Sequence, residues 1–322
     1  MRKKHFNILI TSAGRRVELI KCFKLSIEKL PNVDCKIITV DKNPELSAAC
    51  QVSDKYFKVV SCDHPNYIKD ILNLCLENNI KIIIPTIDTE LVVLAKVRND
   101  FEKRGIYIII SDLDFVQNCS DKRLLDSILF LKGIETPKIF EKNSLKFPFF
   151  LKPFNGSNSI GAKKINSREE ISLKELNDKR NIFQELIPDS WEEYSVDMYF
   201  NKENKLMACT PRKRLAIRGG EISKGVLKKN FIYDYLKIKI KDLQGARGMI
   251  TMQLFTEINN RNIICIEINP RFGGGYPMSY FSGFDVPKLI IKEYIFNEKI
   301  KFFDSWTPDK VMLRYDSMII KN

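Results

Sequence analysis

The sequence contains only two histidines, His5 and His64, and neither lies near another candidate catalytic group along the chain. Ser-His-Asp and Cys-His mechanisms both need a histidine beside the nucleophile, so neither is expected. None of the eight cysteines falls in a Cys-x-x-Cys pair, which disfavours zinc and disulfide sites and favours buried, reduced thiols. The chemistry must therefore come from lysine, arginine, carboxylates, amides, the backbone and a metal ion.

Long apolar runs are also missing. No stretch of about 18 or more apolar residues occurs, so we expect no transmembrane helix and no membrane partner. The basic first residues precede only the short apolar run Phe6–Ile10, which suits a buried strand better than a signal peptide. We therefore expect a cytoplasmic protein.

The charge is strongly basic, with a formal net charge of +13, but 40 acidic residues are interleaved with the 53 lysines and arginines. A nucleic-acid-binding protein is one hypothesis, because phosphate binding favours basic residues. The sequence shows no tight basic block with interleaved aromatics, so a lysine-rich surface without a nucleic-acid partner is favoured. An anionic substrate would also suit this charge.

Strand and helix patterns alternate over the first 115 residues. Apolar runs predict strands at Phe6–Ile10, Lys36–Val40, Lys81–Ile84 and Tyr107–Ile110, and helical spacing of apolar residues lies between them. This alternation predicts a doubly wound parallel sheet in an α/β domain. Ligands bind such sheets at the carboxyl ends of the strands.

Two loops lie at predicted strand ends and are candidates for substrate binding. In the loop 11–16, Ser12 and Arg15 are candidates, since amides at a helix start can hold an anion; a plain strand-to-helix turn is the alternative. In the loop 85–90, Asp88 and Glu90 could bind an amine, or could instead hydrogen-bond the loop itself.

The remainder of the chain reads as a mixture of helices and strands. We expect a helix from about 121 to 132, a helical stretch near 168–180 and a polar loop over 211–230. Strands are expected at 147–151, 182–187, 193–200, 205–210, 249–256, 263–268 and 310–315.

The first motif that carries chemistry covers residues 147–165. A buried strand delivers Lys152, and the glycine- and serine-rich loop 155–161 follows it, with Gly156, Ser157 and Ser159. Glycines let successive amides converge on an anion, and lysine adds a mobile charge for phosphate. An ordinary β-hairpin turn is the alternative.

The second motif covers residues 183–200 and reads as a strand, a linker and an alternating strand. The linker backbone can recognise the edge of a purine through its amides and carbonyls. A carboxylate shortly after the linker can accept hydrogen bonds from both ribose hydroxyls. Glu193 is the candidate for that role. Two strands with solvated acids are the alternative.

The third motif covers residues 249–275. In two adjacent antiparallel strands Gln253, Glu267 and Asn269 can converge, since Glu267 and Asn269 share one face of their strand. All three offer the oxygen ligands that magnesium prefers. Arg271 follows on the same face, near the place where phosphate charge would develop. A hairpin with a Glu–Arg ion pair is the alternative.

Taken together, the three motifs resemble the ATP-grasp superfamily. The resemblance is to a single synthetase unit of the carbamoyl-phosphate synthase large subunit and to its stand-alone carboxylate–amine ligase relatives. It covers nearly the whole chain and is most specific in Gln253 and the run 267–271, EINPR. It implies a Rossmann-like pre-ATP-grasp domain over 1–115 and a two-lobed α+β ATP-grasp domain over 116–322. The small lid lobe would cover about 122–183 and the large lobe about 184–322.

The resemblance also implies ligands and roles. ATP and two magnesium ions would be cofactors, with Mn²⁺ as a substitute; Glu267 would bridge the ions, and Gln253 and Asn269 would each bind one. Lys122 and Lys152 would contact phosphates under the 155–161 lid. The segment Gln184, Glu185, Leu186 and Ile187 would bind adenine. Arg212 and Arg214 would face substrate or phosphate and, with Arg271, act in catalysis.

The activity implied is amide formation between a small carboxylic or amino acid and an amine, through an acyl phosphate, in a homodimer. The chain carries one such unit, without a glutaminase or an allosteric domain, so synthesis of carbamoyl phosphate itself is not expected. The alternatives are an ATP-grasp kinase that releases a phosphorylated product and a nucleotide-binding protein without turnover.

Overall fold

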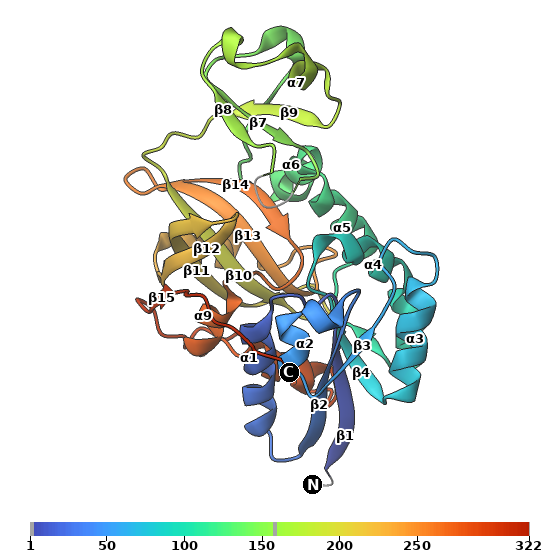
Figure 1. Cartoon of the computed structure of the whole chain (residues 1–322). Helices are drawn as coiled ribbons and strands as arrows, with labels where there is room; N and C mark the ends of the chain where they lie inside the picture. The colour runs from blue at the N-terminus through green and yellow to red at the C-terminus, as the bar shows by residue number, and fades with distance from the viewer. Residues whose placement is uncertain (1–2, 157–159, 322) are drawn as a thin grey trace.

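The computed structural model describes residues 3–156 and 160–321, which build three β-sheets stacked along the molecule (Figure 1). The strands are β1 (Lys4–Ile10), β2 (Val33–Asp41), β3 (Lys55–Lys58), β4 (Ile80–Ile84), β5 (Tyr107–Ile108), β6 (Ile139–Phe140), β7 (Phe149–Pro153), β8 (Lys163–Ile165), β9 (Asn181–Glu185), β10 (Glu192–Phe200), β11 (Leu206–Arg218), β12 (Glu221–Leu227), β13 (Gly248–Glu257), β14 (Asn262–Asn269) and β15 (Val311–Leu313).

Ten α-helices and five 3-10 helices connect these strands in the described residues. The α-helices are α1 (Val17–Glu28), α2 (Ala48–Val52), α3 (Tyr67–Glu77), α4 (Asp88–Glu102), α5 (Leu113–Ser120), α6 (Leu125–Leu129), α7 (Leu173–Asn177), α8 (Phe231–Lys239), α9 (Tyr276–Phe281) and α10 (Val286–Tyr294). The 3-10 helices are η1 (Pro44–Leu46), η2 (Lys122–Leu124), η3 (Phe130–Lys132), η4 (Lys142–Ser144) and η5 (Arg168–Glu170).

The N-terminal sheet is parallel throughout, in the order β3-β2-β1-β4-β5, which confirms the predicted doubly wound domain. Its central strand is buried on both faces: Ile8 and Ile10 face one hydrophobic core and Leu9 the other. Continuous apolar runs are expected for such strands, and they made these strands visible in the sequence. The edge strand β3 was missed because it is short and carries a lysine at each end, as edge strands often do.

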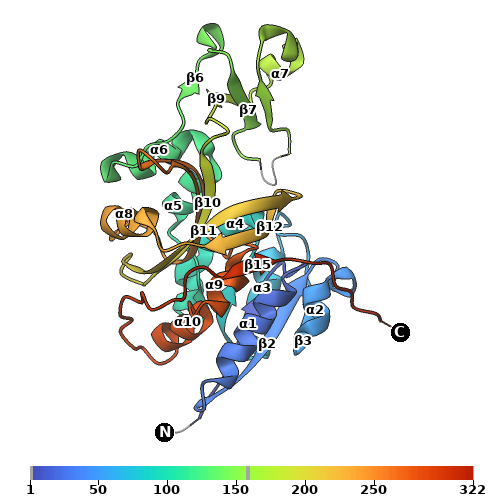
Figure 2. The same ribbon diagram turned by 90° about the vertical axis from the view of Figure 1, so that its left-hand side faces the viewer.

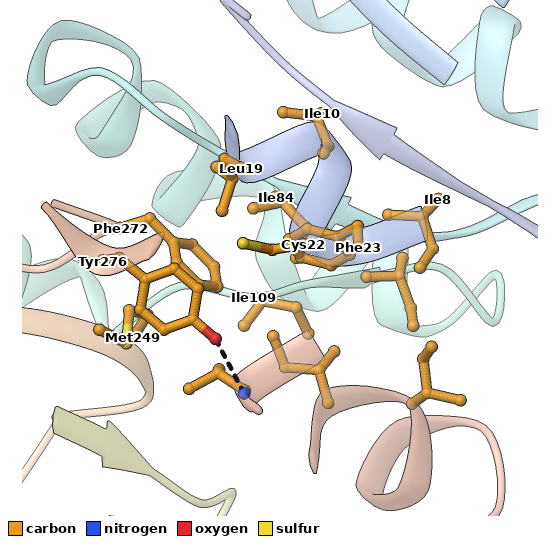
Figure 3. Packing of buried hydrophobic residues seen from close by; sticks show 14 of the residues in the cluster. Ile8, Ile10, Leu19, Cys22, Phe23, Ile84, Ile109, Met249, Phe272 and Tyr276 are labelled. Atoms are coloured by element: carbon orange, nitrogen blue, oxygen red, sulfur yellow. Dashed lines mark hydrogen bonds between the residues drawn. The ribbon is translucent and has the colours of Figure 1, made fainter. Parts of the chain in front are cut away.

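One face of this sheet packs against the C-terminal part of the chain. Cys22 and Phe23 of α1 share a core with Phe272 and Tyr276, and the Tyr276 hydroxyl accepts a 2.9 Å hydrogen bond from the Val286 amide (Figure 3). Helices α9 and α10 therefore cover the α1 side of the N-terminal sheet, although they follow the second sheet in the chain. The N-terminal domain is thereby fixed against the large sheet by a continuous apolar interface.

The large sheet is antiparallel, in the order β14-β13-β10-β11-β12-β15. The loop expected over 211–230 is wrong: β11 continues to Arg218 and returns as β12 after Gly219 and Gly220, both at positive φ. Pro211 and four basic residues argued for a loop. They fit a strand because its polar side chains meet acids or line the cavity described below.

The third sheet is small and antiparallel, in the order β6-β9-β7-β8, and lies on the far side of the large sheet from the N-terminal domain (Figures 1 and 2). The helix expected over 121–132 exists as η2, α6 and η3 in succession, ended by Gly133 in the left-handed conformation. An antiparallel two-lobed domain therefore follows the parallel one, as predicted.

All eight cysteines are free thiols, and five of them are buried, so the expected reduced state agrees with the structure. Among the described residues, none of the helices combines the length and the apolar character that a membrane span requires.

Candidate active site

A cavity of about 1520 Å³ opens where the three sheets meet. Its wall includes strands of the large sheet, Lys152 of the small sheet, loops of the N-terminal domain and the C-terminal segment 310–319. The predicted site residues that the structure describes all line this cavity, apart from Glu90. Ser157 and Ser159 were also predicted, and they lie outside the described residues. Motifs that are far apart in sequence thus contribute to one cavity.

The three candidate metal ligands lie on the β13–β14 hairpin. Gln253 pairs directly with Glu267, and Asn269 is two residues further on the same face. Each of their oxygens faces a cation. Gln253 Oε1 accepts a 3.2 Å hydrogen bond from Arg214, Glu267 Oε1 lies 3.4 Å from Lys122 Nζ, and Asn269 Oδ1 accepts a 3.2 Å bond from Arg271.

This donor set contains one carboxylate and two amides. In the part of the chain that the structure describes, no three histidine, cysteine, aspartate or glutamate residues cluster as a metal site of their own. A site with one carboxylate fits magnesium, which prefers oxygen and takes further ligands from nucleotide phosphates. It does not fit structural zinc, which needs several sulfur or nitrogen ligands.

Two lysines approach this hairpin from the small lobe. Lys152 on β7 is only 9% exposed, and burial together with the charge of Lys122 lowers the pKa of its amine to about 8, although Glu267 opposes the change. Lys122 Nζ donates a 2.7 Å hydrogen bond to the Gly156 carbonyl oxygen. Two cations near one carboxylate are suited to hold a polyanion.

The linker after β9 has backbone amides and carbonyls that are not engaged in a sheet. Gln184 is held inside the small sheet, and the Glu185 amide donates to Lys138 at 2.8 Å. Among the described residues, Leu186 and Ile187 have no backbone hydrogen-bond partner, yet both line the cavity. Free amides and carbonyls beside an apolar wall can bind the edge of a planar heterocycle.

Glu193 lies next along the cavity wall, on β10. Burial raises the pKa of its carboxyl, and Arg214 opposes this from 3.3 Å. The acid predicted to bind ribose therefore has an arginine partner here. Arg214 itself is shared between Glu193, Gln253 and the Gly220 carbonyl oxygen at 3.1 Å.

The other two predicted arginines differ from each other. Arg271 makes a two-pronged ion pair with Asp88 at 2.8 and 2.7 Å; burial lowers its pKa, but Asp88, Glu267 and Glu221 together more than offset this. Arg212 is 1% exposed and its guanidinium is engaged by Asp197 and by the Gly275 carbonyl oxygen at 2.9 Å. Arg212 lines the cavity, but its Nη1 and Nη2 are directed at buried protein groups, so a role of Arg212 toward substrate stays a prediction.

The substrate candidates of the N-terminal domain also separate. Glu90 is fully buried and accepts hydrogen bonds from Ser12 at 2.8 Å, Tyr67 at 2.9 Å and the Thr86 amide at 2.7 Å. Glu90 therefore shapes the loop and does not contact an amine, which is the second of the two alternatives left open by the sequence. Asp88 reaches the cavity but is held by Arg271. Arg15 is exposed and lines the cavity without an ion pair to a described residue.

Two features were missed. Arg16 lines the cavity beside Arg15, and the segment 310–319 forms part of the same wall. The glycines 273–275 make room for protein groups: a Cβ at Gly273 would lie 2.7 Å from Thr251, and one at Gly275 would lie 2.7 Å from the Arg212 guanidinium. The sequence did contain a signal for the β11–β12 hairpin that carries Arg214. This signal is the Gly219-Gly220 pair, which lies between two runs of alternating polar and apolar residues.

Comparison with known proteins identifies the two domains. Residues 8–109 match the model of the PylC-like N-terminal domain, and residues 119–275 match the model of the ATP-grasp domain. No curated protein sequence matches the chain.

Several solved structures have the same fold. The biotin carboxylase domain of 2-oxoglutarate carboxylase from Hydrogenobacter thermophilus superposes with a TM-score of 0.72, at 14% identity, over 96% of this chain and 74% of its own. N5-carboxyaminoimidazole synthetase from Staphylococcus aureus gives 0.68 at 16% identity, over 97% and 82% of the two chains. L-amino acid ligase from Bacillus licheniformis gives 0.68 at 14% identity, over 92% and 75%. The two family models together show that the chain has a PylC-like N-terminal domain followed by an ATP-grasp domain.

Proposed function

We propose that this protein is an ATP-dependent carboxylate–amine ligase. It would activate a small carboxylic or amino acid as an acyl phosphate, join it to an amine, and release ADP and phosphate. The observation that carries the proposal is the meeting of Lys122, Lys152 and Glu267 in one cavity, with Arg271 next along the same wall. This arrangement supports the proposal, because two cations suited to phosphate and a carboxylate suited to a metal line the same cavity.

The nucleotide would lie along the cavity in a fixed direction. The free backbone at Leu186 and Ile187 suits adenine, Glu193 suits the ribose hydroxyls, and Lys122 and Lys152 suit the phosphates. These partners occur in the order in which a nucleotide presents its parts. Structures of the biotin carboxylase domain and of N5-carboxyaminoimidazole synthetase contain ADP, which supports the assignment.

Two magnesium ions would be held by Gln253, Glu267 and Asn269; manganese has the same preference for oxygen. When bound, the metal neutralises phosphate charge and polarises the transferring group. The biotin carboxylase domain was crystallised with MgADP, which agrees with this donor set. Side-chain cations lie 3.2 to 3.4 Å from these three oxygens, which supports the assignment of the oxygens as ligands of a positive ion.

The residues of the chain perform the remaining work by position and charge. A carboxylate oxygen of the acid attacks the γ-phosphorus, the bond from this phosphorus to the ADP oxygen breaks, and ADP leaves. Lys122 and Lys152 hold the negative charge that is redistributed in this step. Arg271, oriented by Asp88, holds the acyl phosphate until the amine attacks its carbonyl carbon and phosphate departs. Closure of the small lobe would exclude water, which otherwise destroys such an intermediate.

The test is ADP release with magnesium and ATP across a panel of carboxylic acids and amines, singly and in pairs, with mass spectrometry of the products. We expect one acid and one amine to stimulate release together and to yield an amide. Glu267→Gln should lower the rate roughly 100-fold or more, since it removes the bridging charge. Glu257→Gln, on the same hairpin but outside the cavity wall, should leave it unchanged.

Two outcomes would contradict the proposal. Near-normal turnover in Glu267→Gln would remove the basis of the metal assignment. A stable phosphorylated acid, formed at the full rate without any amine, would show a kinase.

A further inference from the structure

Two ion pairs line the end of the cavity beyond Arg271. Arg271 binds Asp88 of the N-terminal domain, and Arg314 of the C-terminal segment binds Glu221 of β12 at 2.8 Å. Both carboxylates therefore already have a close cationic partner. Arg314 is also held by a 3.0 Å hydrogen bond that it donates to the Ile222 carbonyl oxygen. The acids at this end are therefore occupied.

Arg16 lies between these two pairs and has no acid of its own. Its Nη2 donates a long 3.3 Å hydrogen bond to the Thr86 carbonyl oxygen, and no described carboxylate lies within 4.0 Å of its guanidinium. Its Nε and Nη1 bond to no described residue and are not among the fully buried polar atoms, so they face the cavity. A Cβ at Gly274 would lie 3.1 Å from Nη1 and 3.1 Å from the Glu221 carboxylate, so the bare glycine leaves room for both groups.

The surrounding charges do not compensate Arg16. Burial, followed by repulsion from Arg271, lowers the pKa of its guanidinium to about 10, against attraction from Glu221 and Asp88. Arg15 adds another cation near Glu221. Four guanidinium groups thus surround two carboxylates, which leaves an excess of two positive charges. A partly buried cation without a partner is costly, and an anionic ligand would relieve that cost.

This excess is separate from the phosphate site. The charges that act most strongly on Lys152 are Lys122 and Glu267, whereas those acting on Arg16 are Arg271, Glu221, Asp88 and Arg314. Arg271 responds both to Glu267 and to Glu221, so it stands between the two regions. An acid whose reacting carboxylate lies at Arg271 would direct its other end toward Arg16.

We propose that Arg16 binds a second anionic group of the acid substrate, and so selects acids that carry a carboxylate or phosphate besides the reacting carboxylate. The identity of the reacting carboxylate rests on the ligase function proposed above. Arg16 thereby determines specificity; phosphoryl transfer itself relies on the lysines and Arg271. The exposed Arg15 strengthens the field that attracts the anion.

The turnover test compares matched probes that differ in one charge. The probes are L-aspartate with L-asparagine, L-glutamate with L-glutamine, and O-phospho-L-serine with L-serine, each offered with a panel of amines. We expect kcat/KM for ADP release to favour the anionic member of one pair by roughly 10- to 100-fold, the range of one charge-assisted contact. The pair that shows the preference tells whether the group is a carboxylate or a phosphate.

Arg16→Gln should abolish this preference and leave the KM for ATP unchanged, and Arg16→Lys should restore part of it. The matched control is Arg218→Gln, which removes a guanidinium from the same cavity wall whose charge is already paired with Asp316 at 2.6 Å. This control should keep the preference. Equal kcat/KM for both members of every pair in the wild type, or a preference that survives Arg16→Gln, would overturn the proposal.

Calorimetric binding of the same probes separates this proposal from the ligase function. Binding of an anionic probe to the wild type but not to Arg16→Gln, without any ADP release, would support the role of Arg16 and contradict the ligase. ADP release without an anionic preference would support the ligase and contradict the role of Arg16. Neither binding nor preference for any anionic probe would also overturn the inference for Arg16.

Discussion

Replacing Lys152 by methionine should stabilise the nucleotide-free protein while it destroys ATP binding. Lys152 is 9% exposed, and its closest charged neighbours are another lysine, which repels it, and Glu267, which attracts it. Its pKa is about 8 in the folded protein against an ordinary 10.5, because burial and Lys122 disfavour the ammonium form. The buried ammonium group of Lys152 therefore lowers the free energy of unfolding of the nucleotide-free protein.

The magnitude follows from the two pKa values. A lowered pKa in the folded state means that the unfolded chain binds the proton more tightly, so below pH 8 the ammonium group opposes folding in full. One pH unit corresponds to about 1.4 kcal/mol, which makes this opposition about 3 kcal/mol at pH 7. It should fall to about 2 kcal/mol at pH 9 and disappear above pH 10.5, where both states are neutral.

Urea unfolding of the wild type and of Lys152→Met at pH 7 and pH 9 measures this difference. Lys164→Met on the neighbouring strand β8, whose side chain is 43% exposed, is the matched control and should change the free energy of unfolding by less than about 0.5 kcal/mol. Methionine keeps the length of the side chain, so packing changes little. A variant no more stable than the wild type at pH 7, or a gain that does not shrink at pH 9, would refute the reasoning.

Two further predictions concern ion pairs. Asp88→Asn removes the charge that orients Arg271, and we expect kcat for ADP release to fall at least about 10-fold with little change in the KM for ATP; an unchanged kcat would show that Arg271 acts without this partner. Asp197→Ala leaves the Arg212 guanidinium buried without a counter-charge, so the free energy of unfolding should fall by about 3–5 kcal/mol in urea titrations. A loss below about 1 kcal/mol would contradict the structural role given to Arg212.

The parts of the fold that the sequence predicted are those with a local signal. The strands β1, β2 and β4 are apolar runs because both faces of the sheet are buried. The β13–β14 hairpin was identified for the opposite reason, since Glu267 and Asn269 interrupt an apolar strand and need a compensating partner. Each signal lies within a segment of fewer than ten residues. In a strand this short, the spacing between two residues decides whether their side chains lie on the same face.

The parts that were missed depend on partners distant in the chain. Glu90 carries no sequence sign that Ser12, Tyr67 and Thr86 converge on it. Arg16 likewise acquires its importance because the acids near it are bound by Arg271 and Arg314, which lie 255 and 298 residues further along. Charge balance in a cavity is a sum over many segments, and a sequence does not state which segments share a cavity.

Arg212 and Arg214 show where inference from spacing ends. They are two residues apart on β11 and therefore lie on one face of the strand, so the sequence offers no reason to treat them differently. Helix α9 begins against one of them and brings the Gly275 carbonyl oxygen to Arg212, beside the Asp197 carboxylate from β10. Arg214 lies two residues further along β11, where its guanidinium contacts Glu193 and Gln253 in the cavity wall. Arg212 thus holds the glycine loop, whereas Arg214 contacts oxygens that the proposed nucleotide and metal would take, which makes Arg214 the stronger of the two catalytic candidates.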